Sequence, residues 1–468
     1  MSKRIKKHTC IILIVLITII LCSFIAADLI SPSVAEAAEL PPVEESGECV
    51  TVQTTLLAVD TMPVPDFCIN GLCKLVLYSD AMFGAFGAGF SWEAYYYQWG
   101  PENSNLWIGG PNLSLGGMQF SEGTGYNGNS TAEGVFLGGT ANDGGFIRIM
   151  DDGPLENDPD LWSIESQASE ELTSASLQVC AIPGAITTGS IYSSQAVAMP
   201  DFCKDDLCMI LRFTWVDFGA FGPGLSMPVY YDQDSITNEW VGGPNICVGG
   251  VSFSSSAGLN GGGVSYIFDG GYADDGGYAR LMDDGEEYSD SQWSVVLSPD
   301  VTLNMVYYFF APLSCTKHDI SALSMDIDTP SFCIDEMCTI VRWTDAFFGA
   351  LSPGLSWPVN YNQNSADNLW IGGPVINIAG DTYNQGPGLN GDASSETIFG
   401  SGLTTGGNEG SVTLRDDSYE AFETGPDQWN VLFDAQDDLT AASYYFCSNT
   451  CEETIFLIQK EYLPLINH

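Results

Sequence analysis

Short apolar runs alternate with clusters of turn-forming residues along almost the whole chain. Runs such as GGYARLM (276–282), CTIVRWT (338–344) and AASYYFC (441–447) are rich in β-branched and aromatic residues, which favour strands. Gly, Asn, Asp and Pro separate the runs, and the Asn-Gly pairs suit tight hairpin turns because both residues tolerate a positive φ. Beyond the first 38 residues, no long segment has the 3.6-residue periodicity of an amphipathic helix. The pattern predicts an all-β protein of antiparallel strands.

The same ordered set of landmarks occurs three times. PDFCINGLC (65–73), PDFCKDDLC (200–208) and PSFCIDEMC (330–338) begin the copies, at spacings of 135 and 130 residues. Each copy continues with a Gly-punctuated segment, an aromatic segment ending in Gly-Gly-Pro, a turn ending in Asn-Gly and an acidic stretch that closes at a tryptophan. A period near 130 residues is an ordinary domain size, so the copies are separate modules and not the rungs of a solenoid.

We therefore predict three tandem antiparallel β-sandwich modules of a jelly-roll-like kind, at residues 39–180, 181–314 and 315–451. The apolar segment 452–468 resembles nothing in the repeats, and we expect it to form an extra strand or a docking segment.

The N-terminus predicts export from the cytoplasm. A basic start, MSKRIKKH, precedes a 15-residue apolar run (11–25) and then small residues, which is the order of a secretory signal peptide over residues 1–38. A membrane span needs about 20 apolar residues, so an uncleaved anchor is the weaker alternative. We expect a secreted or cell-surface protein that is not inserted in the membrane after cleavage.

The charge narrows the choice of partners. The chain has 13 basic and 60 acidic residues, a net charge of −47. Four of the basic and two of the acidic residues precede residue 39, so the mature chain is more negative still. Such a field repels phosphate backbones and anionic headgroups, which argues against nucleic acid as a partner. Adaptation to a saline habitat would produce the same bias.

The cysteines predict disulfide bonds. Twelve of the 14 follow residue 38, an even number in a chain expected to be exported. In each copy a C-x4-C pair brackets a turn, and a hairpin of that length brings two Cα atoms about 5.5 Å apart, within disulfide range. A redox or metal role is the alternative, but redox pairs are usually C-x-x-C and no histidine recurs nearby. We predict the bonds Cys68–Cys73, Cys203–Cys208 and Cys333–Cys338, with Cys49–Cys180 joining the ends of the first module.

The acidic stretches are candidate calcium sites. Each packs several carboxylates into a short loop, and Ca²⁺ takes six to eight oxygen ligands in flexible geometry. The spacing fits no EF-hand, and a solvated acidic turn is the alternative interpretation. The candidate ligands are Asp151, Asp152 and Asp158 in the first copy, Asp283, Asp284 and Asp290 in the second, and Asp416 and Asp417 in the third.

Recurrent aromatic residues are candidate carbohydrate contacts. Flat rings near carboxylates and amides hold sugars because the apolar faces of a sugar stack on them. The alternative is that each ring anchors the core of its own module, because large aromatic residues are mostly buried. The candidates are Trp107, Trp240 and Trp370, before Gly-Gly-Pro, and Tyr96, Tyr231 and Tyr361, on a nearby strand.

These features favour a non-enzymatic extracellular protein that binds a glycan or another matrix or cell-surface component, with calcium as a supporting ion. Three equivalent modules would add avidity. A structural surface-layer or filament subunit that self-associates is the main alternative. A glycan hydrolase is less favoured, because it needs two facing carboxyl groups about 5–9 Å apart, whereas adjacent aspartates on a strand point to opposite faces.

Overall fold

The structure is a computed structural model of the chain. It describes residues 49–449 except for the interior stretches 55, 57–58, 70, 84–87, 91–92, 100–105, 111, 116–117, 121–122, 127–132, 152–160, 205, 220, 226, 235–238, 244–245, 249–250, 254–257, 260–264, 284–291, 335, 349–353, 356–357, 365–368, 374–375, 379–380, 384–387, 390–395, 401–402, 405–409 and 417–427. The predicted signal peptide and the apolar tail therefore lie outside the described residues.

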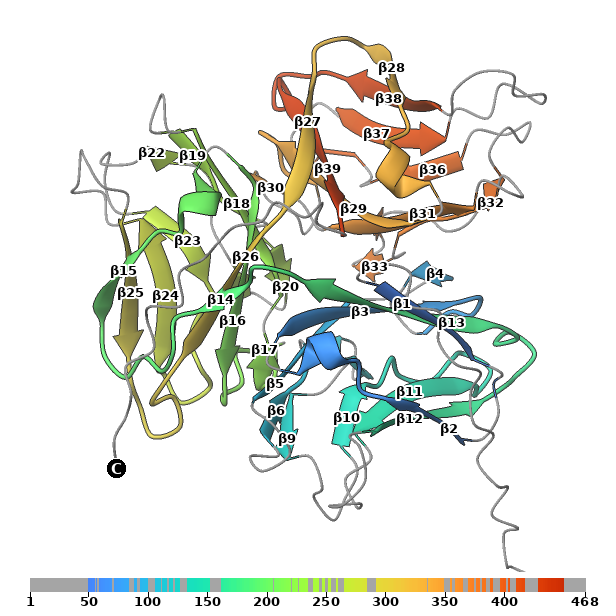
Figure 1. Cartoon of the computed structure of the whole chain (residues 1–468). Coiled ribbons are helices and arrows are strands. Elements are labelled where there is room, and N and C mark those ends of the chain that lie inside the picture. The colour runs from blue at the N-terminus through green and yellow to red at the C-terminus, as the bar shows by residue number, and fades with distance from the viewer. Residues whose placement is uncertain are drawn as a thin grey trace, which may run out of the picture. The chain divides into compact units, whose positions relative to one another are not determined.

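The first module is a sandwich of two antiparallel sheets, drawn in blue to teal in Figure 1. The larger sheet has the order β1-β13-β3-β5-β6-β9, with β4 paired to β3, and the smaller has the order β10-β11-β12-β2. A separate hairpin pairs β7 with β8. Its strands are β1 (Cys49–Thr54), β2 (Val59–Pro63), β3 (Leu72–Ser79), β4 (Gly89–Phe90), β5 (Ala94–Trp99), β6 (Leu106–Ile108), β7 (Leu113–Leu115), β8 (Met118–Phe120), β9 (Thr124–Tyr126), β10 (Glu133–Phe136), β11 (Phe146–Asp151), β12 (Leu161–Gln167) and β13 (Ala175–Ile182).

The second module repeats this topology. Its sheets have the orders β14-β26-β16-β18-β19-β22, with β17 paired to β16, and β15-β25-β24-β23, and its hairpin is β20-β21. The strands are β14 (Ile186–Thr187), β15 (Gln195–Ala198), β16 (Cys208–Thr214), β17 (Gly224–Leu225), β18 (Val229–Asp234), β19 (Glu239–Val241), β20 (Ile246–Val248), β21 (Val251–Phe253), β22 (Gly258–Leu259), β23 (Ser265–Asp269), β24 (Tyr278–Asp283), β25 (Gln292–Ser298) and β26 (Tyr307–Pro312).

The third module does the same, with sheets β27-β39-β29-β31-β32-β35 (β30 paired to β29) and β28-β38-β37-β36 and the hairpin β33-β34. Its strands are β27 (Ser314–Ile320), β28 (Ser324–Asp328), β29 (Met337–Thr344), β30 (Gly354–Leu355), β31 (Val359–Asn364), β32 (Leu369–Ile371), β33 (Ile376–Ile378), β34 (Asp381–Tyr383), β35 (Gly388–Leu389), β36 (Glu396–Phe399), β37 (Ser411–Asp416), β38 (Gln428–Asp434) and β39 (Ala442–Ser448). Three tandem antiparallel β-sandwich modules, as predicted, account for the chain that the structure describes.

Helical structure within the described residues is limited to three short 3-10 turns, one at the start of each copy. They are η1 (Asp66–Cys68), η2 (Asp201–Cys203) and η3 (Ser331–Cys333). Each follows a proline, whose fixed φ suits the entry to a turn, and each ends at a cysteine that is bonded across the hairpin to the next strand.

Burial differs between the two sheets. The strands β11, β24 and β37 of the smaller sheets alternate buried and half-buried residues, as expected when one face packs on a core and the other meets solvent. The central strands of the larger sheets, β3, β16 and β29, are buried on both faces almost throughout. One face closes the sandwich, and the other packs against the neighbouring modules.

The structure contains all four predicted disulfide bonds, Cys49–Cys180 and the three hairpin bonds, and adds a fifth between Cys315 and Cys447. The bonds Cys49–Cys180 and Cys315–Cys447 join the first and last strands of modules 1 and 3. Every one of the five lies within a single module. Among the described residues there is no helix long and apolar enough to cross a membrane.

Candidate functional site

The six aromatic residues predicted as carbohydrate contacts are buried in the three module cores. In module 1, Tyr96 stacks on Trp107 at 5.4 Å between ring centroids and meets the edge of Trp162 at 5.0 Å. Modules 2 and 3 repeat this arrangement with Tyr231, Trp240 and Trp293 and with Tyr361, Trp370 and Trp429, and none of the nine rings is more than 1% exposed. In this structure the rings are core residues and not an exposed platform, because both faces of each are covered.

Each aromatic core also encloses a carboxylate. Asp151, Asp283 and Asp416 are the last residues of β11, β24 and β37, and each is 1% exposed and paired in register with the closing tryptophan of its module. Burial, followed by the charge of Asp283, holds the pKa of Tyr231 well above its usual value. The carboxylate is thus part of the core and not of a solvated turn.

Only some of the predicted calcium ligands belong to the residues that the structure describes. Asp152, Asp158, Asp284, Asp290 and Asp417 lie outside the described residues. In the part of the chain that the structure describes, no group of three or more His, Cys, Asp or Glu side chains is placed to hold a metal ion. Calcium binding by the acidic loops stays a prediction.

The repeated Gly-Gly-Pro segments make contacts between modules, which all belong to one compact unit. The backbone N–H of Leu225 in module 2 donates to the carbonyl of Gly109 in module 1 at 3.5 Å, and that of Phe90 in module 1 donates to Gly372 in module 3 at 3.4 Å. Gly243 of module 2 lies against the backbone of Leu355 in module 3. Equivalent segments therefore meet equivalent short strands (β17, β30 and β4) from module 1 to 2, 2 to 3 and 3 to 1.

An apolar cluster fills the space between the larger sheets. It includes Leu72 and Tyr95 of module 1, Met209 and Tyr230 of module 2, and Leu355 of module 3. A ring contact and a hydrogen bond follow the same cyclic order: the ring of Tyr97 lies 5.4 Å from that of Phe309, and the hydroxyl of Tyr445 donates to Asp232 at 2.7 Å. Burial of this apolar surface favours the association of the modules.

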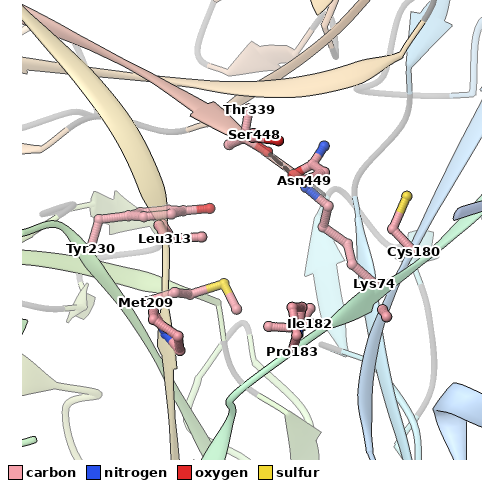
Figure 2. Close-up of a pocket in the computed structure, with 12 residues that line it drawn as sticks. Lys74, Cys180, Ile182, Pro183, Met209, Tyr230, Leu313, Thr339, Ser448 and Asn449 are labelled. Atoms are coloured by element: carbon pink, nitrogen blue, oxygen red, sulfur yellow. Dashed lines mark hydrogen bonds between the residues drawn. The ribbon is translucent and has the colours of Figure 1, made fainter. Parts of the chain in front are cut away.

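A buried ion pair lies at the centre of this contact. Lys74, on β3, is 5% exposed, and its Nζ lies 3.6 Å from Oε2 of Glu93, which is 4% exposed. The ammonium donates to Oγ1 of Thr339 at 2.8 Å, to Oδ1 of Asn360 at 2.8 Å and to Oδ1 of Asn449 at 3.0 Å. Figure 2 shows Lys74 reaching toward Asn449 and Thr339 of module 3. Burial lowers the pKa of Lys74, and the charge of Glu93 opposes part of that effect.

Glu93 accepts hydrogen bonds from all three modules. Its Oε1 accepts from the hydroxyls of Tyr95 and, at 3.5 Å, Tyr230, and its Oε2 accepts from Nδ2 of Asn360 at 2.9 Å. These three donors occupy the same position in their modules, one residue before the tyrosine of each aromatic core. Burial, and then the charge of Glu93, raises the pKa of Tyr95 and of Tyr230 well above the usual range. We call Lys74, Glu93, Tyr95, Tyr230, Thr339, Asn360 and Asn449 the central cluster.

A small cavity of about 30 Å³ adjoins the central cluster. It is lined by Lys74, Tyr230, Thr339 and Asn449 together with the apolar side chain of Met209 and others, as Figure 2 shows. A cavity of this size accommodates one or two water molecules, and its polar lining can bind them.

Sequence reasoning missed the central cluster because it compared what the copies share. Lys74 corresponds to Met209 and Thr339, the residue after the second cysteine of each hairpin, and Glu93 corresponds to Pro228 and Pro358. The available signal was a lysine and a glutamate at positions that are uncharged in the sister copies, in a chain with few basic residues.

Module 2 carries a further feature on the outer face of its smaller sheet. The guanidinium of Arg280 lies over the rings of Tyr266, Tyr272 and Tyr278, at 5.1, 5.3 and 4.2 Å from their centroids, and its Nε contacts Asp269 at 3.1 Å. Tyr272 is 59% exposed. We call these five residues the tyrosine patch.

No protein-family model, curated protein or solved structure matches this chain.

Proposed function

We propose that this chain is a non-enzymatic extracellular structural protein, a single-chain trimer of β-sandwich modules that serves as a subunit of a surface layer, filament or matrix. The observation that carries the proposal is the cyclic set of contacts in which the repeated Gly-Gly-Pro segment of each module meets the short strand of the next. Among the landmarks that the structure describes, the tyrosine and tryptophan rings form the module cores and the Gly-Gly segments make the contacts between modules.

The symmetry of these contacts supports a role in assembly. A head-to-tail contact that closes after three copies is the interface of a cyclic trimer. Here one chain supplies all three copies, which fixes the stoichiometry and allows the centre to be asymmetric. A homotrimer of module 1 would bring three lysines and three glutamates to the axis, whereas this chain places one Lys74 beside one Glu93.

Composition and covalent chemistry support an extracellular setting. The five disulfide bonds fit an oxidising compartment, and the net charge of −47 favours solubility before assembly. Secretion through the predicted signal peptide is part of the proposal.

The proposal is tested by substitution of one glycine at a module contact. A Cβ at residue 243 would lie 2.7 Å from the backbone nitrogen of Leu355, so Gly243→Ala forces modules 2 and 3 apart. Gly276→Ala is the matched control, because Gly276 has a φ of +104° but nothing within 4 Å of its added Cβ. We expect electron microscopy and light scattering of the mature protein at rising concentration, with and without calcium, to show regular assemblies that Gly243→Ala abolishes and Gly276→Ala retains. A mature protein that stays monomeric at every concentration would overturn the proposal.

The tyrosine patch supports glycan binding as a second candidate function. One exposed tyrosine ring, Tyr272, and two half-buried ones lie beside an arginine and a carboxylate, and together they offer stacking surfaces and hydrogen-bond partners for a sugar. We expect retention on a glycan array that Tyr272→Ala removes and that Tyr192→Ala, a change at an exposed tyrosine elsewhere in module 2, leaves intact. Absence of retention for the unmodified protein would reject this candidate.

A further inference from the structure

We propose that Lys74 and Asn360 join through an intramolecular amide bond, formed by the protein itself, with Glu93 carrying the proton between the two nitrogens. The bond would connect β3 of module 1 to β31 of module 3. This inference stands on the central cluster alone and does not depend on the proposed structural role.

The reacting groups are already in contact. Nζ of Lys74 lies 2.8 Å from Oδ1 of Asn360, and the amide carbon Cγ is one bond of about 1.23 Å from that oxygen, so Nζ is at most about 4 Å from Cγ. Both side chains are buried and held by several partners. Holding two groups near the attack distance of about 3–3.5 Å replaces a bimolecular encounter, and effective molarities reach about 10⁵ M or more.

The environment favours a neutral amine, which is the nucleophilic form. Burial disfavours the charged ammonium and lowers the pKa of Lys74. Oε2 of Glu93 lies 3.6 Å from Nζ and can accept its proton, which converts a buried ion pair into a neutral amine and a neutral carboxylic acid. Loss of two buried charges lowers the desolvation cost.

The same carboxylate oxygen reaches the leaving group. Nδ2 of Asn360 donates to Oε2 of Glu93 at 2.9 Å, so one oxygen atom lies beside both the attacking and the departing nitrogen. A single positioned acid–base group can therefore move a proton from Nζ to Nδ2. The hydroxyls of Tyr95 and Tyr230 hold the other oxygen of this carboxyl group in place.

A donor is also placed for the charge that develops on the amide oxygen. Oγ1 of Thr339 lies 3.1 Å from Oδ1 of Asn360 and 2.8 Å from Oδ1 of Asn449, and its single hydrogen can be donated to either oxygen. When Nζ adds to Cγ, negative charge forms on Oδ1, and a fixed donor in a buried site stabilises it.

The reaction balances without an oxidant or any other reactant. Nζ of Lys74 adds to Cγ of Asn360, and Glu93 transfers a proton from Nζ to Nδ2. The Cγ–Nδ2 bond then breaks, the Nζ–Cγ amide remains and one ammonia leaves. This ammonia takes up the proton that Glu93 first accepted from the Lys74 ammonium, so ammonium is released and Glu93 is again a carboxylate. The adjoining cavity provides space for the departing molecule.

The geometry selects Asn360 over Asn449, the other amide in contact with Lys74. Nδ2 of Asn449 donates to the carbonyl of Met337 at 3.0 Å, and a carbonyl cannot supply the proton that the leaving nitrogen needs. Asn449 therefore acts as a positioning residue, which accepts from Nζ at 3.0 Å.

The mass of the reduced mature protein tests the proposal directly. We expect a deficit of one ammonia, about 17 Da, relative to the sequence, and a peptide containing Lys74 joined to a peptide containing Asn360 in tandem mass spectra. A protein at full mass, with Lys74 recovered in a linear peptide, would overturn the proposal whatever the variants do. A linkage from Lys74 to Asn449 would overturn the assignment of Asn360.

Variants separate the roles of the residues. Lys74→Met introduces the residue that module 2 carries at this position, and we expect it to keep the fold and to abolish the deficit. Asn360→Asp makes water the leaving group, about 18 Da, and should yield the same joined product. We expect most of the Glu93→Gln protein to keep its full mass, because little of the bond forms without the proton carrier. We expect Asn449→Ala to form the bond. Bond formation at the normal rate in Glu93→Gln would refute its role as proton carrier.

Discussion

Arg212 and Arg342 are buried in modules 2 and 3, whereas module 1 has an apolar residue at the corresponding position. This difference allows a quantitative prediction. Arg212 is 0% exposed, and its Nη1 donates to the carbonyl of Ala279 at 2.9 Å. The guanidinium lies between the rings of Phe218 and Phe268, at 4.3 and 4.7 Å from their centroids. Its cross-strand neighbour is Tyr308. Burial lowers the pKa of Arg212 and raises that of Tyr308.

Module 1 uses a different pair at the same place. Four residues after the second hairpin cysteine, β3 carries Leu77 where β16 carries Arg212, and the cross-strand neighbour on β13 is Leu177. We therefore expect Arg212→Leu combined with Tyr308→Leu to give module 2 the apolar solution that module 1 already has.

The magnitudes follow from the environment of each group. Arg212→Leu alone removes two desolvated cation–π contacts of about 2 kcal/mol each, together with the charge of Arg212 that opposes the rise in the pKa of Tyr308. Relief of the buried charge offsets several kcal/mol of that loss, so we expect a net destabilisation of about 2 kcal/mol. Tyr308→Leu alone should cost a similar amount. Replacement of both partners by apolar residues is often neutral, so the double variant should lie within about 1 kcal/mol of the unmodified protein.

Hydrogen exchange of the amides in β16, β24 and β26 measures the local free energy of opening for module 2 within the full chain. We expect a coupling free energy of about 2–4 kcal/mol from the double-mutant cycle. Arg342→Leu with Tyr444→Leu is the parallel test in module 3, where Arg342 donates to Val412 at 3.1 Å and burial raises the pKa of Tyr444 to about 12. Additive costs, with a double variant about 4 kcal/mol less stable than the unmodified protein, would refute this account of the pair.

Two further predictions concern covalent and acid stability. Loss of the Cys49–Cys180 bond, which closes a loop of separation 131, should lower the free energy of unfolding by about 5 kcal/mol through loop entropy. Loss of the hairpin bond Cys68–Cys73, of separation 5, should lower it by about 2 kcal/mol. Equal melting temperatures of the two double-serine variants would contradict this difference. A hydrogen bond with Asp275, supported by the backbone N–H groups of Leu303, Thr302 and Gly277, lowers the pKa of Asp300 from 3.8 to about 2. Because the folded-state pKa is below the unfolded value, the contribution of Asp300 to stability is present above pH 3.8 and is lost as the pH falls toward 2. The melting temperature of Asp300→Asn should therefore fall less steeply over that interval, and identical slopes for the two proteins would count against the role of Asp300.

Local pattern was enough to predict the three modules. The hairpin cysteines, the turn residues and the alternation seen in β11 and β24 all act over a few residues, so the sequence displays them directly. The nearly continuous apolar run of strand β16, CMILRFT, is typical of a strand covered on two sides, and the structure buries it on both faces.

The central cluster could not be found in the same way. Lys74 is 265 residues from Thr339 and 286 residues from Asn360, so no local pattern relates them. The contact depends on how separate modules dock, and docking is decided by surfaces that sequence periodicity does not specify. The aromatic rings show the converse case: Trp240 recurs in a local pattern that the sequence displays, and the structure buries it in the core of its own module.

The disulfides at the ends of modules 1 and 3 determine how the chain would carry tension. Cys49 and Cys180 are bonded across the first and last strands of module 1, so a pull on the polypeptide passes from one sulfur to the other and bypasses the strands between them. The bond between Cys315 and Cys447 carries tension past the strands of module 3 in the same way. Among the described residues, the ends of module 2 are joined only by hydrogen bonds, with Ile186 and Thr187 of β14 facing β26. Module 2 is therefore the module whose ends are least restrained covalently. It would unravel first under tension if Lys74 and Asn360 were not joined, whereas a bond between these residues links module 1 directly to module 3 and carries the force past module 2.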